Sequence, residues 1–138
     1  MKHTSEFEDS LAPLTTDADI LRRVHDLIGR ANLAQLWLLF LDHEDVQLPL
    51  LIPINGLPLY PDDGAAGIFA NVADMMPGVG ADSLVIVWER RGAPKMTDRD
   101  AAWLRYLAAA CASAGVRLRA VLLSHSEGVR WVPPDDYA

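Results

Sequence analysis

The sequence predicts an α/β fold: a mixed-sheet sandwich of about five strands with helices on its faces. Two apolar, β-branched runs at 83–89 and 116–124 flank an alanine-rich stretch of helical period at 97–114, which is typical of a strand–helix–strand unit. Two further apolar runs, at 33–41 and 46–54, are separated by a polar turn at 42–45. These two runs are short enough for strands, so together they predict a β-hairpin.

The first two helices are predicted from apolar residues that recur at helical spacing. The first helix is capped by Thr16 or Asp17 and is expected to end near Asn32. The second is expected over 65–76 and ends before Pro77, because the residue before a proline disfavours the helical conformation.

The remaining elements are predicted from prolines, from helix-capping residues and from alternation of apolar residues. Pro49 and Pro53 cannot donate ladder hydrogen bonds, so the second hairpin strand should lie at a sheet edge or carry a bulge. Thr97 is a good N-cap for the long helix, and Gly115 stands where a left-handed C-cap residue belongs. Alternating residues at 116–123 predict a strand with one buried face, and a short last strand follows at 129–132.

The chain reads as one domain. Residues 1–16 are polar and acidic and predict a flexible lead, 17–134 form the domain, and 135–138 are expected to be a flexible tail. The single cysteine, Cys111, excludes an internal disulfide and fits a cytoplasmic location. The start of the chain does not resemble a signal peptide, and no apolar run is long enough to span a membrane.

The net charge of −7 argues against general affinity for nucleic acid, which requires clustered lysines and arginines. Most of the arginines lie in the second half of the chain, however, so a local basic face remains open.

Several phrases together match the motif pattern of one family. They are the apolar phrase ending in Asp42 at 37–42, the phrase at 82–87, and the spacing of Gly92, Pro94 and Thr97-x-x-Asp100. The chain, over roughly 17–132, resembles the RadC-like branch of the JAB/MPN (JAMM) metalloprotease superfamily. The resemblance implies a JAB/MPN-like fold.

The resemblance also implies which positions would have held a metal. In that family two histidines and an aspartate bind zinc, and an upstream glutamate acts as the base. The histidine positions fall here on Val87 and Glu89, the aspartate on Asp100, and the glutamate near Leu50 or Leu51. Valine cannot bind a metal, and two carboxylates make a poor zinc site. A degenerate former site near Val87, Glu89 and Asp100 is therefore expected, with no catalytic residue, no metal and no cofactor.

Other candidate residues carry weaker signals. His43 lies in an acidic turn, Ser124-His125-Ser126 lacks the frame of an activated serine, and Cys111 should be a buried apolar residue. If two tryptophans are partly exposed beside two arginines, they form a contact surface, since Trp and Arg are enriched at interfaces. Its members would be Trp88, Arg90, Arg91 and Trp103.

The function predicted from these observations is that of a non-catalytic JAB/RadC-like domain that binds a protein partner or self-associates. One alternative is a hydrolase with a rearranged site near Glu89, Asp100 and either His125 or His43. The other is an accessory protein associated with nucleic acid.

Overall fold

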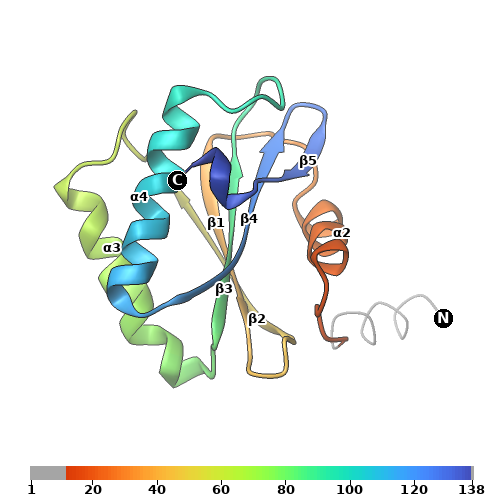
Figure 1. Cartoon of the computed structure of the whole chain (residues 1–138), viewed down its shortest axis with the longest axis vertical. Helices are drawn as coiled ribbons and strands as arrows, with labels where there is room; N and C mark the ends of the chain where they lie inside the picture. Colours follow the sequence, from red (N-terminus) through yellow and green to blue (C-terminus); the bar gives the residue numbers. More distant parts are fainter. Residues whose placement is uncertain (1–11, 138) are drawn as a thin grey trace.

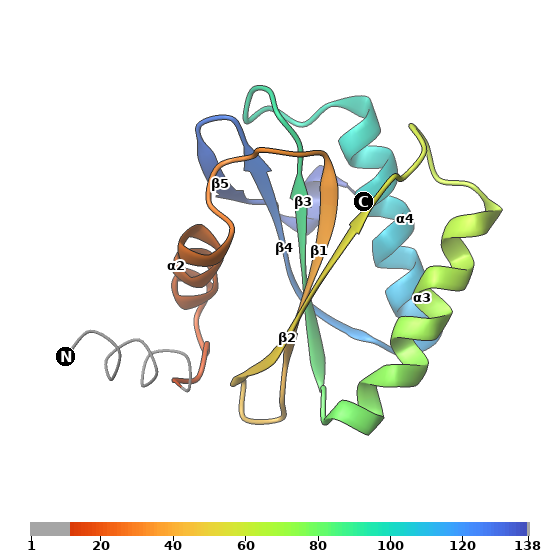
Figure 2. The same cartoon turned by 180° about the vertical axis from the view of Figure 1, so that it is seen from behind.

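The computed structural model describes residues 12–137, which form a five-stranded mixed sheet between two helical layers (Figures 1 and 2). In chain order the elements are α2 (Asp17–Leu27), β1 (Gln35–Leu41), β2 (Gln47–Asn55), α3 (Asp63–Met75), the 3₁₀ turn η1 (Met76–Val79), β3 (Ser83–Glu89), α4 (Asp98–Ala114), β4 (Arg117–His125), β5 (Gly128–Trp131) and the 3₁₀ turn η2 (Pro134–Asp136). The predicted α/β class is confirmed, with each predicted helix and strand present.

The sheet order is β2-β1-β3-β4-β5, and only β3 and β4 run parallel. Helices α3 and α4 cover one face and α2 covers the other (Figure 1). β3 lies at the centre of the sheet, and all seven of its residues are buried. This explains why it is apolar without alternation, since both of its faces are covered.

The hairpin prediction is confirmed in detail. β2 pairs only with β1, so it is an edge strand, and the register shifts between Leu39 and Leu41. Pro49 and Pro53 are both exposed on this edge, where a missing donor costs no ladder bond.

The predicted caps are also present, although the first helix ends earlier than expected. Thr16 and Thr97 each form a capping box, and Gly115 is left-handed with φ of 72°. The first helix ends at Leu27, before Asn32, because Gly29 takes φ of 67° and reverses the chain. α3 ends before Pro77, as predicted, and the separate turn η1 follows, where a proline in the first turn lacks only a donor that would be unpaired anyway.

One residue within each predicted flexible end is packed against the domain. Leu14 is buried in the core beneath α2, and its amide donates to the Asp45 carbonyl at 2.8 Å. At the other end Tyr137 packs into the core, and the Arg105 Nε donates to its carbonyl at 3.2 Å. The rest of the predicted lead, 1–11, and residue 138 lie outside the described residues. Within 12–137, no helix has the length and apolar character needed to cross a bilayer.

Candidate functional site

The end of β3 delivers successive side chains to opposite faces of the sheet. Val87 lies in the core on the α2 side, whereas Trp88 lies in the core on the side of α3 and α4. Glu89 follows on the α2 side, where the indole of Trp37 reaches it. This alternation decides which of the predicted site residues can meet.

Asp100 is the acceptor of a buried polar cluster at the start of α4. Its carboxylate accepts from the Trp88 indole Nε1 at 2.8 Å and from the Thr97 amide at 2.9 Å. Arg90 donates to it from Nε at 3.1 Å and from Nη2 at 2.7 Å, as a two-pronged ion pair. The remaining Arg90 donors reach the carbonyls of Ala93 and Lys95, so this guanidinium also shapes the β3–α4 loop.

Glu89 is the acceptor of a second buried cluster on the opposite face. One oxygen accepts from the amides of Asn32 and Leu33, at 2.7 and 2.9 Å. The other accepts from the Gln35 Nε2 and the Trp37 Nε1, both at 2.8 Å. Glu89 therefore fastens the α2–β1 connection to the central strand.

The expected former metal site is not assembled. Val87 and Glu89 lie on one face of the sheet and Asp100 on the other, so the resemblance-based mapping of these three residues onto one site is wrong. The residues that face Asp100 are Trp88 and Arg90, which only donate hydrogen bonds. Throughout 12–137, no group of three or more His, Cys, Asp or Glu side chains is placed to hold a metal ion.

The expected contact surface does not form either, because three of its four members are buried. Trp88 is 2% exposed, Trp103 is 0% and Arg90 is 9%, which leaves Arg91 exposed. Trp103 stacks on Trp88 with ring centroids 5.8 Å apart, and its Nε1 donates to the Pro58 and Leu59 carbonyls. Adjacent helical residues are only about 100° apart, so Trp103 and Leu104 are both able to face the core.

The hydrolase alternative loses its carboxylate pair, because Glu89 and Asp100 lie on opposite faces of the sheet. His125 ends β4 at the same end of the sheet, where burial and then Arg90 lower its pKa. His43 lies in the β1–β2 turn, at the end of the sheet opposite Glu89. Ser124 is buried and donates to the Gly29 carbonyl at 2.6 Å. Burial raises the pKa of Cys111 to about 11, so its thiol is a core group and not a nucleophile, as the sequence predicts.

Both buried carboxylates should make stability fall in acid. Burial favours the neutral form of each, but the donors around them outweigh it and hold the pKa of Asp100 below 3.8 and that of Glu89 below 4.5. The unfolded chain therefore binds protons first as pH falls. His125 acts in the same direction from about pH 6.5, since burial and then Arg90 lower its pKa. We expect the urea midpoint to fall steeply below about pH 4.5, and less steeply in Glu89→Gln.

A small pocket of about 190 Å³ opens at this end of the sheet, beside Trp88, Glu89 and Arg99. Arg99 lies 5.4 Å from the centre of the Trp88 ring and donates to the carbonyls of Pro58 and Leu59. The guanidinium of Arg99 is thus already hydrogen-bonded within the chain. The pocket contains no acid–base pair.

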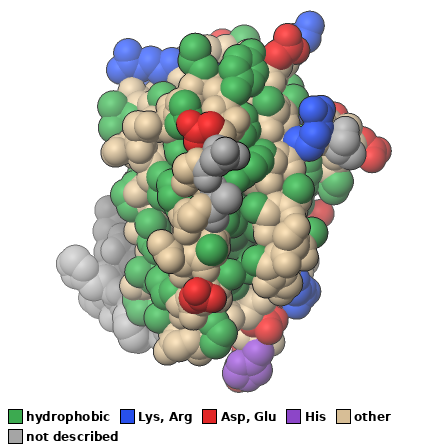
Figure 3. All heavy atoms as spheres, turned by 90° about the vertical axis from the view of Figure 1, so that its left-hand side faces the viewer, with side chains coloured by type: hydrophobic (Ala, Val, Ile, Leu, Met, Phe, Trp, Pro, Cys, Tyr) green, Lys and Arg blue, Asp and Glu red, His purple; other side chains and the backbone are tan. Residues whose placement is uncertain are grey.

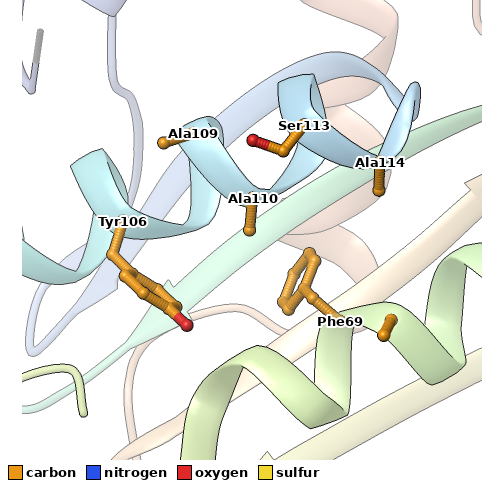
Figure 4. A pocket seen from close by; sticks show the side chains of 7 residues that line it. Phe69, Tyr106, Ala109, Ala110, Ser113 and Ala114 are labelled. Carbon is orange, nitrogen blue, oxygen red and sulfur yellow. The ribbon is translucent and has the colours of Figure 1, made fainter. Parts of the chain in front are cut away.

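A larger groove lies between α3 and α4 and has a volume of about 420 Å³. Its lining residues are Phe69, Ala70, Tyr106, Ala109, Ala110, Ser113 and Ala114. Figure 4 shows Phe69 and Tyr106 directed into the space between the helices, while the alanines leave it open. The groove was not predicted, although the run of alanines on the outer side of α4 was a signal for it.

No family model matches the chain, and no curated protein matches it. The JAB/MPN resemblance therefore stays a hypothesis, and the function is inferred from the geometry of the site.

Proposed function

We propose that this chain is a non-catalytic domain, built on a JAB/RadC-like frame, that acts by binding protein. The observation that carries the proposal is the saturation of both carboxylates at the end of β3. Glu89 accepts four hydrogen bonds and Asp100 accepts from Trp88, Arg90 and Thr97, all from the chain itself. Neither carboxylate is free to bind a metal or to move a proton, since both are already fully coordinated by donors.

The distribution of arginines supports a protein partner over nucleic acid. A phosphate-binding surface needs several free cations on one face. Here four arginines of the second half are paired with acids: Arg90 with Asp100, Arg117 with Asp82, Arg119 with Asp17 and Arg130 with Asp136. They are also spread over both ends of the sheet, because Arg117 is level with Ser83 whereas Arg90 follows Glu89.

The contact surface that fits this proposal is the groove between α3 and α4, together with the helical surface around it. For an uncharged face with a groove of this kind, contact with an apolar partner is more favourable than exposure to water. The buried, single Cys111 needs no oxidising compartment, which is consistent with action in the cytoplasm.

Metal content tests the non-catalytic part. After dialysis against zinc and then against buffer, elemental analysis should find far less than one ion per chain. One zinc ion per chain that survives this dialysis would overturn the proposal.

Protein retention tests the binding part. The immobilised wild-type chain should retain a protein, either a second copy of itself or another protein. The immobilised Ala109→Glu variant, which has a charge beside the groove, should not retain it. Retention of nothing by the wild type would refute protein binding. A partner retained equally by both forms would remove the groove as its site.

A further inference from the structure

The middle of α3 and the second half of α4 contain no charged residue. Charged residues make up 22% of the chain, yet 64–73 in α3 and 106–114 in α4 contain none. Figure 3 shows this side of the molecule: lysines and arginines lie at its margins, acidic side chains lie within it toward both ends of α3, and most of the rest is hydrophobic or otherwise uncharged. A helix that faces water normally carries charges on its outer side, and their depletion is typical of an interface core.

Two exposed apolar side chains lie beside this face. Leu59 is 71% exposed and Tyr60 is 55% exposed, in the loop between β2 and α3. The loop runs next to the first turns of α4, on the same side of the sheet as the groove (Figures 1 and 2). Arg99 and Trp103 of α4 hold it by hydrogen bonds to the Leu59 carbonyl, at 2.9 and 3.1 Å. A loop fixed in this way presents its side chains with little entropy left to lose on binding.

Resting on the function proposed above, we infer that the partner is a second copy of this chain. The α3/α4 faces of two copies pack about a twofold axis, and Leu59 and Tyr60 of each copy enter the groove of the other. The loop is held at Arg99 and Trp103, whereas the groove runs along 106–114, so the two features are about 13 Å apart along α4. A twofold axis between them exchanges loop and groove, which makes the face complementary to itself.

The charge distribution allows a second copy to bind despite the net charge of the chain. Two copies each with a net charge of −7 repel one another, so self-association requires a contact face that keeps charges away from the axis. The α3/α4 face meets this requirement. A different partner would gain from complementary charges, and this face offers almost none.

The size of the face sets the expected strength. The charge-free segments, 64–73 and 106–114, give a surface roughly 20 Å wide and about 15 Å long, to which the loop with Leu59 and Tyr60 adds. This is smaller than a standard specific interface, which buries about 800 Å² per partner. The dimer should therefore be weak and in reversible equilibrium with the monomer.

Sedimentation equilibrium of the purified full chain, from low micromolar to near-millimolar concentration, tests the inference. The wild type should pass reversibly from monomer to dimer. Ala109→Glu and Tyr60→Ser should each weaken association by about tenfold or more. Ala18→Glu makes the same charge change on α2, at the opposite face of the sheet, and should associate as the wild type does.

Thermal unfolding checks that every variant is folded. Both test residues are exposed, so their melting temperatures should stay near that of the wild type. A wild type that stays monomeric throughout, or an Ala109→Glu variant that dimerises equally well, would overturn the inference. If the monomeric wild type still retains another protein, the self-association fails and the proposed function stands.

Discussion

Replacing Asp100 with alanine is expected to lower the free energy of unfolding by about 3–5 kcal/mol. The substitution leaves the buried Arg90 guanidinium without its anion and the Trp88 indole without its acceptor. It also removes the side chain that accepts from the Thr97 amide in the capping box. Urea unfolding followed by circular dichroism measures the loss.

Asp98→Ala is the matched control, because Asp98 lies in the same helical turn but is exposed. Only its interaction with the helix dipole is lost, which is worth up to about 1 kcal/mol. If Asp100→Ala does not fold, Asp100→Asn keeps the shape and one acceptor and should still be clearly destabilised. Equal effects of the substitutions at 98 and 100 would contradict a role for the buried pair.

Replacing Glu89 with alanine is expected to cost about 3–4 kcal/mol, because hydrogen bonds to a charged group are worth about 1.5–3 kcal/mol each and are not additive. The change leaves the amides of Asn32 and Leu33 and the side-chain donors of Gln35 and Trp37 without an acceptor. Besides a lower urea midpoint, we expect faster hydrogen exchange at the Asn32 and Leu33 amides.

Two other substitutions serve as comparisons for Glu89→Ala. Glu89→Gln keeps one oxygen acceptor, so it should lose roughly half as much stability as Glu89→Ala. Glu127→Ala removes an exposed carboxylate at the same end of the sheet and should stay within about 0.5 kcal/mol of the wild type. Unchanged exchange at Asn32 and Leu33 in Glu89→Ala would show that Glu89 does not hold the α2–β1 connection.

Sequence patterns predicted the elements better than the contacts between them. Thr97 and Gly115 were sufficient to bound α4, because capping depends on a few adjacent residues. The placement of Val87 and Glu89 beside Asp100 failed because residues were counted across a loop. A one-residue change of register moves a strand side chain to the other face of the sheet, and loop length does not determine that register.

The two acceptor clusters illustrate what a sequence leaves open. Glu89 receives its donors from residues 52–57 positions earlier, which only the pairing of β1 with β3 brings near. Trp103 was considered for a contact surface on the condition that it is exposed, and its burial depends on Trp88 and the 58–59 backbone, which come from two other parts of the chain. The α3–α4 groove likewise depends on how two helices cross, which their composition does not specify.

The prolines of β2 also bear on how copies of the chain behave when crowded. An open edge strand can recruit another strand and seed amyloid-like growth without limit. Here one border of the sheet is interrupted by Pro49 and Pro53, and the other is the four-residue β5. Polymerisation of chains through backbone pairing of their edge strands is thereby disfavoured. A twofold dimer formed through helices, as inferred above, has no free binding face left and so cannot grow into a polymer.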